Sequence, residues 1–308
     1  MKRLAVIDVG SNSIKAVVVD ALTDQDIARK TESVRIYPVG PKMELTPDRV
    51  EMAAHAIARL VDFARENGAK DIAIVGTSAL RECSNRMDLI QRVKVLTHLP
   101  LTVISGEVEA RLTAQGVRSD SAFSSYSKMI VFDLGGGSLE AMILNRDICL
   151  RAKSFPLGSV RLTQAFLQGE LGKIDAQKEL DISTEVVRNV QDFLQVSHPE
   201  EYLVVGAGGG FVALGLYLEA IGEKPVNGRL PILRIRELKD RLCSLSASER
   251  SSVPGIPADR LDIMPAALIT ICALADLTKA EAFYFTSRGL RHGVIHFLLQ
   301  EPHFFSHE

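Results

Sequence analysis

One motif, Asp-x-Gly-x-x-Ser, occurs twice in this sequence, each time between two runs of apolar residues. The first copy covers Asp8–Ser13 and the second covers Asp133–Ser138. The pattern predicts a buried strand that ends at the aspartate, a turn that tolerates positive φ and close backbone approach, and a second strand. Such a turn offers backbone N–H groups and a hydroxyl group to an anion, with a carboxylate beside them for a cation. Two such turns that face each other would form a clamp for a phosphate group.

A third glycine cluster, Gly206–Phe211, follows a predicted strand and opens a predicted helix. The dinucleotide-binding fingerprint ends in a small residue, G-x-G-x-x-G/A, whereas this chain has Phe211 at that position. A P-loop is also excluded, since no Gly-Lys-Ser/Thr follows any of these glycines. The sequence therefore favours phosphate sites of neither the Rossmann nor the P-loop kind.

Strands and helices alternate in the first third of the chain. Apolar residues at helical spacing follow Thr46, a good N-cap, and Pro47, a good first helical residue, and they predict a helix that Gly68 ends. We expect strands at 3–8, 14–20, 33–37, 71–76 and 101–104, and helices at 47–67, 84–96 and 106–116. In the second half we expect strands within 129–145 and at 148–154, 202–205 and 282–285, and helices at 158–169, 175–197, 211–221, 234–246 and 261–279, with a last one ending near Leu299.

Both halves thus open with the same strand–turn–strand hairpin and continue as a mixed sheet with helices. This order predicts a duplicated fold with the ligand between the halves. The polar, serine-rich segment Ser119–Lys128 separates the two copies and is the best candidate for a hinge, with a return crossing near Ser287–Gly293. We therefore predict a first domain of residues 1–118 plus 290–308 and a second domain of residues 119–289.

The composition is that of a globular protein with a good core, since 46% of the residues are hydrophobic and 24% are charged. The net charge of −2 gives no overall attraction to nucleic acid or to a membrane surface. The four cysteines form no C-x-x-C pair, which argues against a zinc site and a disulfide framework. No apolar stretch is long enough to cross a membrane, and we expect no signal peptide. A cytoplasmic location is the default expectation.

Further motifs follow in order along the chain. Together with Asp8-x-Gly-Ser-Asn-Ser and Asp133-Leu-Gly-Gly-Gly-Ser138-x-Glu140 they are Thr77-Ser-Ala-Leu-Arg81-Glu, Ile104-Ser-Gly-x-x-Glu109-Ala-Arg111-Leu, Gly158-Ser-Val-Arg161-Leu-Thr, Glu249-Arg250 … Pro254-Gly-Ile, Arg260-x-Asp262-Ile-x-Pro265-Ala and Ser287-x-Gly-Leu-Arg291. Over essentially its whole length the chain resembles the exopolyphosphatase/guanosine pentaphosphate phosphohydrolase (Ppx/GppA) family, which belongs to the superfamily of actin, sugar kinases and heat-shock ATPases. The resemblance implies an α/β fold of two duplicated actin-like ATPase (ribonuclease H-like) domains, with mixed sheets flanked by helices and the active-site cleft between them.

The resemblance also implies roles for individual residues. Glu109 matches the family's catalytic glutamate, which would deprotonate a water molecule for in-line attack on the terminal phosphorus. Arg81 would neutralise charge that builds on the transferred phosphoryl group. The expected Mg²⁺ ligands are Asp8, Asp133 and Glu140, and the expected donors to phosphate oxygens are Asn12, Ser13, Gly135, Gly136, Gly137, Ser138, Gly208 and Gly209. Glu140 occupies the position that is Lys15 in the first copy, so the two halves are not chemically equivalent.

Without the resemblance, several of these residues have simpler explanations. Glu107 and Glu109 both fall in the first turn of a predicted helix, where the helix dipole favours acids anyway. Arg81 alone would be a solvated loop arginine. His292 and His296 are four positions apart on a predicted helix, and with no acidic third ligand nearby we expect a packed or solvated pair rather than a metal site.

The sequence departs from the family pattern at a few places. Val108 replaces the first of two acids before Ala-Arg, Gly210 stands where a threonine is usual, and His292 stands where the family often has glutamate. Arg35 is kept, but Ile36-Tyr37-Pro38 replaces what usually follows it, in a strand expected near the cleft. None of these changes removes a proposed catalytic group.

The first functional hypothesis is Mg²⁺-dependent hydrolysis of the terminal phosphoanhydride of inorganic polyphosphate, with Glu109 as the general base. Hydrolysis of guanosine pentaphosphate is a close alternative, because both substrates present a terminal phosphoanhydride to the same water and base. An ATP-dependent kinase of the same superfamily is a further alternative, although the sequence around Glu109 favours water as the acceptor. The last alternative is a non-catalytic alarmone sensor. The presence of Glu109 speaks against it, because a protein that only senses a ligand need not keep a catalytic base. The resemblance also favours a homodimer.

Overall fold

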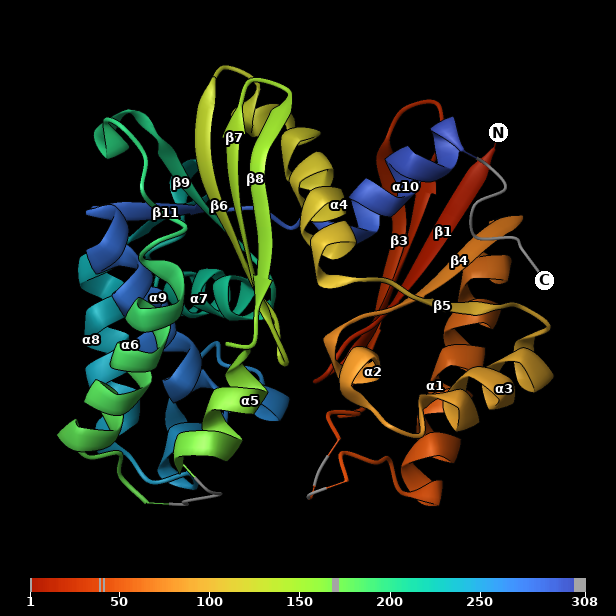
Figure 1. Cartoon of the computed structure of the whole chain (residues 1–308), viewed down its shortest axis with the longest axis horizontal. Helices are drawn as coiled ribbons and strands as arrows, with labels where there is room; N and C mark the ends of the chain where they lie inside the picture. Colours follow the sequence, from red (N-terminus) through yellow and green to blue (C-terminus); the bar gives the residue numbers. More distant parts are fainter. Residues whose placement is uncertain (1, 39, 41, 168–171, 302–308) are drawn as a thin grey trace. The chain divides into compact units, whose positions relative to one another are not determined.

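The structure of the protein is a computed structural model that describes residues 2–38, 40, 42–167 and 172–301. The chain forms two compact units, one of Met1–Ser119 together with Arg288–Glu308 and one of Asp120–Ser287. In Figure 1, which colours the chain from red to blue, the blue C-terminal helix lies with the red and orange elements of the first unit. The chain thus leaves the first unit once, builds the second unit from one continuous segment, and returns.

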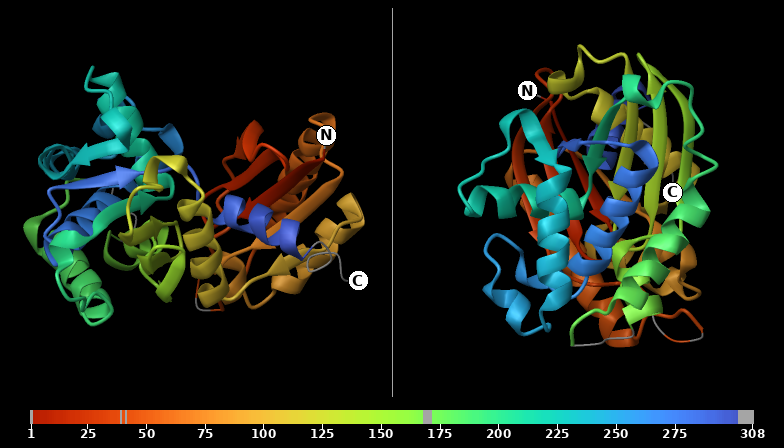
Figure 2. Two further views of the ribbon diagram at one scale, coloured as in Figure 1. Left: turned by 90° about the horizontal axis from the view of Figure 1, so that it is seen from above. Right: turned by 90° about the vertical axis from the view of Figure 1, so that its left-hand side faces the viewer.

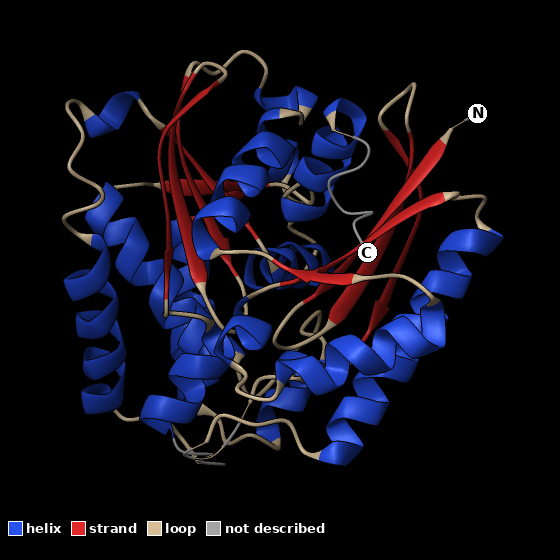
Figure 3. Cartoon of the chain, turned by 45° about the vertical axis from the view of Figure 1, so that its right-hand side comes forward, coloured by secondary structure: helices blue, strands red, loops and turns tan. Residues whose placement is uncertain are grey.

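The first unit contains a five-stranded sheet with helices on both faces (Figure 3). Its strands are β1 (Arg3–Val9), β2 (Ile14–Asp20), β3 (Gln25–Glu32), β4 (Asp71–Gly76) and β5 (Leu101–Val103). Its helices are α1 (Pro47–Glu66), α2 (Ser78–Glu82), α3 (Arg86–Thr97), α4 (Gly106–Arg118) and α10 (Leu290–Gln300). In the strand order β3-β2-β1-β4-β5, the first three strands are antiparallel neighbours, and β4 and β5 run parallel to β1.

The side chains of β1 explain why both faces of this sheet are covered. Leu4 and Val6 pack in one cluster with Val294 of α10, whereas Ala5 packs in another cluster with Ala64 of α1. Successive residues of a strand point to opposite faces of the sheet. An apolar strand such as β1 therefore needs a helix on each side to remove it from water.

The predicted strand at 33–37 is wrong, because the third strand of the sheet is β3 and residues 33–38 form no regular element. β3 lies at the edge of the sheet, and its side chains are exposed or only half-buried. Its polar sequence therefore lacks the apolar alternation that marks a strand. Val34 and Ile36, which suggested a strand, are buried in a loop that runs beside the first Asp-x-Gly-x-x-Ser turn.

The second unit is built on a six-stranded sheet. Its strands are β6 (Lys128–Leu134), β7 (Leu139–Asn145), β8 (Ile148–Phe155), β9 (Leu203–Ala207), β10 (Arg229–Pro231) and β11 (Ala282–Phe285). Its helices are α5 (Ser159–Leu162), α6 (Ala176–Val190), α7 (Gly209–Ala220), α8 (Ile232–Ser244) and α9 (Met264–Thr278), with a π-helical turn η2 (Thr163–Leu167) and the 3-10 helices η1 (Ser121–Phe123), η3 (Pro199–Glu201), η4 (Val226–Gly228), η5 (Glu249–Ser252) and η6 (Ala258–Arg260).

The two sheets share their topology. The order β8-β7-β6-β9-β11 repeats β3-β2-β1-β4-β5, with the same antiparallel and parallel neighbours, and β10 is added at the edge. The opening hairpins also share their register, since Asp8 lies opposite Lys15 and Asp133 lies opposite Glu140. The predicted fold class, two duplicated actin-like units of mixed sheets flanked by helices, is therefore confirmed.

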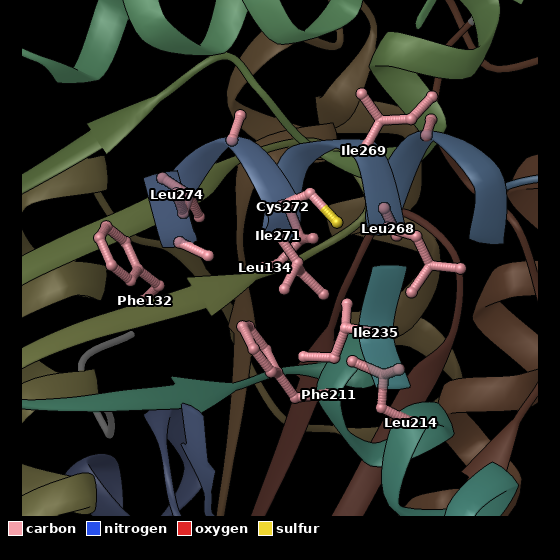
Figure 4. Packing of buried hydrophobic residues seen from close by; sticks show 14 of the residues in the cluster. Phe132, Leu134, Phe211, Leu214, Ile235, Leu268, Ile269, Ile271, Cys272 and Leu274 are labelled. Atoms are coloured by element: carbon pink, nitrogen blue, oxygen red, sulfur yellow. The ribbon is translucent and has the colours of Figure 1, made fainter. Parts of the chain in front are cut away.

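The core of the second unit gathers side chains from β6, α7, α8 and α9 (Figure 4). Phe132 and Phe211 both pack against Phe283, with ring centroids 6.3 and 5.1 Å away. α9 is buried almost all round, as expected for a helix without a polar face. Even so, no helix in the described part of the chain is long and apolar enough to span a membrane.

In the first unit, α4 and α10 lie side by side with their backbones in contact (Figure 2, left). A Cβ atom on Gly116 of α4 would lie 1.9 Å from the carbonyl oxygen of Gly289. A Cβ atom on Gly293 of α10 would lie 1.7 Å from the carbonyl oxygen of Leu112. Such distances leave room for no side chain, so the crossing requires glycine on both helices.

The predicted hinge segment Ser119–Lys128 contains local structure. Asp120 caps η1 by accepting a hydrogen bond from Ala122 N, and Phe123 is buried. Arg288 Nε donates to Ser119 Oγ at 2.9 Å. The points at which the chain leaves and re-enters the first unit are therefore joined inside that unit.

Candidate functional site

The C-terminal ends of the parallel strands carry one predicted metal ligand and the two predicted catalytic residues of the first unit. Asp8 is the second-to-last residue of β1, Arg81 lies in α2 after β4, and Glu109 lies in α4 after β5. β1, β4 and β5 are parallel neighbours, so their C-terminal ends meet at one edge of the sheet. This edge is where open α/β sheets bind their ligands.

Arg81 and Glu109, the two predicted catalytic residues, form an ion pair. Arg81 Nη1 lies 2.5 Å from Glu109 Oε2 and also donates to Ile104 O at 3.2 Å. Glu109 is 7% exposed, whereas Glu107, in the same helical turn, is exposed and pairs with Arg111 Nε at 3.0 Å. The preference of acidic residues for the first turn of a helix therefore suffices to explain Glu107. It does not account for Glu109, whose carboxylate is buried and oriented by a guanidinium group.

The first Asp-x-Gly-x-x-Ser turn joins β1 to β2 and contains the buried Ser13. Lys15 lies opposite Asp8 in this strand pair, and unlike charges in such positions attract. Burial raises the pKa of Asp8, and the positive charges of Lys15 and Arg291 act against this effect. Arg291, at the start of α10, therefore belongs to the surroundings of Asp8.

Asn12, in the same turn, is 6% exposed, and the two ends of its amide differ in their partners. Arg35 Nε donates to Asn12 Oδ1 at 2.9 Å. Asn12 Nδ2 is buried and has no hydrogen-bond partner among the described residues. Burying an unpaired donor costs about 1–3 kcal/mol, which an oxygen of a bound phosphate group would offset. The predicted role of Asn12 as a phosphate donor stays a prediction, but the donor it needs is present.

In the second unit, two acidic side chains lie opposite each other. Asp133 of β6 pairs with Glu140 of β7, and Glu140 pairs in turn with Ser154 of β8. Glu140 is 2% exposed, and its Oε1 accepts a hydrogen bond from Ser154 Oγ at 2.7 Å. Like charges directly opposite each other on a sheet are unfavourable. A cation bound by these carboxylates would therefore stabilise the pair.

The glycine-rich turn between β6 and β7 is held by the start of α5. Three carbonyl oxygens of the turn accept hydrogen bonds from it: that of Gly135 from Ser159 N at 3.0 Å, that of Gly136 from Val160 N at 2.8 Å and that of Gly137 from Arg161 Nε at 2.9 Å. The carbonyl side of the turn is thus fixed by protein donors. The N–H groups of the turn and the hydroxyl group of Ser138 are the part suited to an anion.

The third glycine cluster lies against Asp133. Gly208 has a φ of +88°, and a Cβ atom there would lie 2.5 Å from Asp133 Oδ1, so both its conformation and this close approach require glycine. A Cβ atom on Gly209 would lie 2.2 Å from Arg260 Nη2. The guanidinium group of Arg260 therefore rests on the first residue of α7, beside the two glycines predicted to bind phosphate.

The described residues contain no group of three or more His, Cys, Asp or Glu side chains arranged to hold a metal ion. Of the predicted Mg²⁺ ligands, Asp133 and Glu140 are neighbours in the second unit, and Asp8 belongs to the first. Mg²⁺ is usually bound by one or two carboxylates, with water molecules and substrate phosphates as its other ligands. The pair in the second unit is thus a donor set suited to Mg²⁺.

His292 and His296 each pair with a different acid. His292 Nε2 lies 2.9 Å from Asp26 Oδ1, and His296 Nε2 lies 3.1 Å from Asp24 Oδ1. Burial lowers the pKa of His292, and Asp26 acts against this. Burial alone would raise the pKa of Asp26, but the hydrogen bond and charge of His292, with those of Arg29, lower it to about 2. The expectation that no acid lies near the histidines is wrong, because Asp24 in the turn from β2 to β3 and Asp26 at the start of β3 both lie beside α10.

Three residues near the predicted site received no role from the sequence, namely Arg291, Arg260 and Ser154. Arg260 and Arg291 each belong to one of the motifs that carry the family resemblance, and this membership was the only signal in the sequence that could have found them. Ser154 carries no such signal, because only the register of β7 with β8 places it beside Glu140.

The fold and these turns define a two-unit protein of the actin-like class, with an Asp-x-Gly-x-x-Ser turn at the C-terminal end of the first strand of each sheet. A model of the Ppx/GppA phosphatase family matches residues 15–301. The chain therefore belongs to the Ppx/GppA phosphatase family, and it is a hydrolase.

Relatives and solved structures agree with this family. An uncharacterised protein from Streptomyces coelicolor is 29% identical over 302 residues, which cover 95% of this chain and 89% of that protein. A guanosine-5'-triphosphate,3'-diphosphate pyrophosphatase from Aeromonas salmonicida is 26% identical over 97% of this chain, which spans only 60% of that enzyme's length. The crystal structure of an exopolyphosphatase from Cytophaga hutchinsonii shares the fold, with a TM-score of 0.86 and 22% identity over 97% of this chain and 98% of that one.

Proposed function

We propose that the protein is a Mg²⁺-dependent exopolyphosphatase, which removes the terminal phosphate of inorganic polyphosphate by attack of water. The observation that carries the proposal is the ion pair of the buried Glu109 with the half-buried Arg81, which lies at the C-terminal ends of the parallel strands of the first sheet. This pair offers a carboxylate to accept a proton from water and a guanidinium group to stabilise charge on the transferred phosphoryl group. Membership of a phosphatase family and the fold shared with an exopolyphosphatase support the proposal.

In the proposed reaction, the oxygen of a water molecule forms a bond to the terminal phosphorus while the bond from that phosphorus to the bridging oxygen breaks. Glu109 takes up a proton of the water, and the shortened polyphosphate leaves with the electron pair of the broken bond. Asn12, Ser13, the N–H groups of residues 135–138 and those of residues 208–209 would donate hydrogen bonds to phosphate oxygens. A Mg²⁺ ion with Asp8, Asp133 and Glu140 as its carboxylate ligands would neutralise charge on the same oxygens.

Guanosine pentaphosphate is the second candidate substrate. Two relatives from Aeromonas bear the name guanosine-5'-triphosphate,3'-diphosphate pyrophosphatase, at 26% and 25% identity. The terminal phosphoanhydride of this nucleotide presents the same bond to the same water and base, so the first unit's ion pair would serve either substrate.

Release of inorganic phosphate tests the proposal. The protein with Mg²⁺ should release phosphate from polyphosphate, lose this activity when EDTA is added, and regain it when Mg²⁺ is restored in excess. Release from guanosine pentaphosphate alone would favour the second candidate. No release from either substrate would sink the hydrolase mechanism proposed here.

A pair of matched variants tests the base. Glu109→Gln should lower kcat by about 10²–10⁴-fold, because the amide cannot accept the proton of the attacking water. Glu107→Gln, on the exposed side of the same helical turn, should turn over like the wild type. Equal activities of the two variants would show that Glu109 is not the general base.

A further inference from the structure

We infer that Arg35 is a positioning residue for phosphate binding, which fixes the amide of Asn12 so that Nδ2 is presented as a donor to a phosphate oxygen. The inference rests on the proposed function, since it concerns the turn that would hold the phosphate group of the substrate.

The hydrogen bond from Arg35 decides which end of the Asn12 amide is the donor. An asparagine amide can be turned over with almost no change of shape, and only its partners distinguish the oxygen from the nitrogen. Arg35 Nε donates and cannot accept, and it lies 2.9 Å from Asn12 Oδ1. Turning the amide over would set two N–H donors against each other. The oxygen therefore faces Arg35, and the nitrogen is directed away from it.

The nitrogen held in this way is a donor without an acceptor in the described part of the chain. Asn12 is 6% exposed, and its Nδ2 has no hydrogen-bond partner among the described residues. Buried donors are nearly always paired, so an unpaired one points to a ligand oxygen that completes it. The motif around Asn12 supplies the matching context, since the turn also contains the buried hydroxyl group of Ser13 and follows Asp8.

The backbone beside Arg35 holds the same turn in place. The N–H groups of Ile36 and Tyr37 both donate to Ser11 O, at 3.0 and 3.1 Å. Arg49 Nη1 donates to Tyr37 O at 3.3 Å and so ties the segment to α1. The main-chain bonds fix the position of the turn, whereas the Arg35 side chain selects the orientation of the Asn12 amide.

Binding of inorganic tripolyphosphate, measured by isothermal titration calorimetry with Mg²⁺ present, tests this inference without any turnover. Arg35→Met, which keeps the apolar stem and removes the donor, should bind about fivefold more weakly, and Asn12→Ala about tenfold. The double variant should bind no more weakly than Asn12→Ala alone, because Arg35 acts through Asn12. Arg35→Lys, which keeps a charge and a donor, should bind within about twofold of the wild type.

Arg49→Met is the matched control, because it removes another arginine that braces the same segment without touching Asn12. It should bind tripolyphosphate like the wild type, and any loss should appear only in its melting temperature. In steady-state assays Arg35→Met should raise KM and leave kcat nearly unchanged, a split that a loss of stability would not produce.

Additive losses in the double variant would overturn the inference, and so would wild-type affinity in Arg35→Met or a wild-type protein that does not bind tripolyphosphate. A different result would contradict the proposed function. If tripolyphosphate binds in an Arg35-dependent way but no phosphate is released from polyphosphate or guanosine pentaphosphate, the hydrolase mechanism falls and the role of Arg35 stands.

Discussion

Arg81 and Glu109 meet although 28 positions separate them in the chain. They meet because β4 and β5 are parallel neighbours and the helices that carry the two residues start from the same edge of the sheet. One nitrogen of Arg81 contacts both the carboxylate of Glu109 and the carbonyl oxygen of Ile104. A positive charge alone does not reproduce this arrangement, since lysine lacks the planar fork of arginine.

Substitutions of Arg81 should therefore lower turnover to different degrees, depending on whether the positive charge is kept. We expect Arg81→Lys to lower kcat by about tenfold, because the charge is kept but its orientation is lost, and Arg81→Ala to lower it by about 10²–10³-fold. Steady-state release of phosphate from polyphosphate measures both. Arg111→Ala, which removes the exposed partner of Glu107, is the control and should stay within about twofold of the wild type. Wild-type kcat in Arg81→Ala would contradict a catalytic role.

Among the elements, α4 and α10 cross so closely that each needs a glycine at the contact, Gly116 in α4 and Gly293 in α10. Glu109 lies in α4, and Arg291, whose charge acts on Asp8, lies in α10. The crossing therefore holds together two helices that each contribute to the surroundings of the predicted site. Its tightness makes it sensitive to one added methyl group.

We expect Gly116→Ala to lower the free energy of unfolding by about 1–3 kcal/mol or more, because its Cβ atom would lie 1.9 Å from the carbonyl oxygen of Gly289 and the helices would have to separate. Thermal unfolding followed by circular dichroism measures the effect. Gly210→Ala, in α7, is the control, since its nearest neighbours would lie at 3.6 Å. It should be neutral or stabilise by up to about 1 kcal/mol. An unchanged melting temperature in Gly116→Ala would refute the close crossing.

The pairing of His292 with Asp26 makes the link between α10 and β3 dependent on pH. Burial holds the pKa of His292 below its usual value of about 6.5, so the folded state disfavours the charged imidazole. As the pH falls below about 6.5, the unfolded chain binds the proton first, and the free energy of unfolding decreases. The loss from this one group has a limit of about 1.4 kcal/mol per pH unit.

Replacing His292 should therefore flatten the acid side of the stability profile. We expect His292→Gln, which can still donate to Asp26, to lose less stability than the wild type between pH 7.5 and pH 5.5. Denaturant unfolding at both pH values measures the difference. His296→Gln removes a partly exposed imidazole from the same helix and should follow the wild-type profile. Equal slopes for wild type and His292→Gln would show that this buried histidine does not control the acid response.

At the scale of the whole molecule, the protein repeats one sheet and gives the two copies different chemistry. The same register sets Asp8 opposite Lys15 in the first unit and Asp133 opposite Glu140 in the second. A single position thus carries a cation in one copy and an anion in the other. For this reason we expect the second unit to supply two of the three carboxylate ligands of the metal ion, Asp133 and Glu140, and the first unit to supply the base together with Asp8.

The oligomeric state is a prediction at the same scale. The family resemblance favours a homodimer, so light scattering coupled to gel filtration should give twice the chain mass of 33.6 kDa. The value should persist on dilution to low micromolar concentration, and chromatography of a chemically cross-linked sample provides an independent check. A mass of one chain over the whole concentration range would refute the dimer.

The local pattern of the sequence determined the duplicated hairpins and most of the helices. The helix expected at 47–67 is α1, and the two Asp-x-Gly-x-x-Ser turns occur where the motif predicts them. These features depend on residues close together in the chain: apolar periodicity, an N-cap, a proline and glycines that permit a turn. The motifs from Asp8 to Arg291, and the order in which they follow one another along the chain, were also enough to indicate the family.

Only the tertiary structure decided which distant side chains meet. Strand order placed Arg81 beside Glu109, a loop without regular structure placed Arg35 on Asn12, and the register of β8 placed Ser154 on Glu140. β3 was not predicted from the sequence, because an edge strand that is not buried on both faces needs no apolar alternation. Local preferences act over a few residues, whereas these contacts depend on which strands become neighbours, and that is decided when the apolar faces of all the elements are buried together.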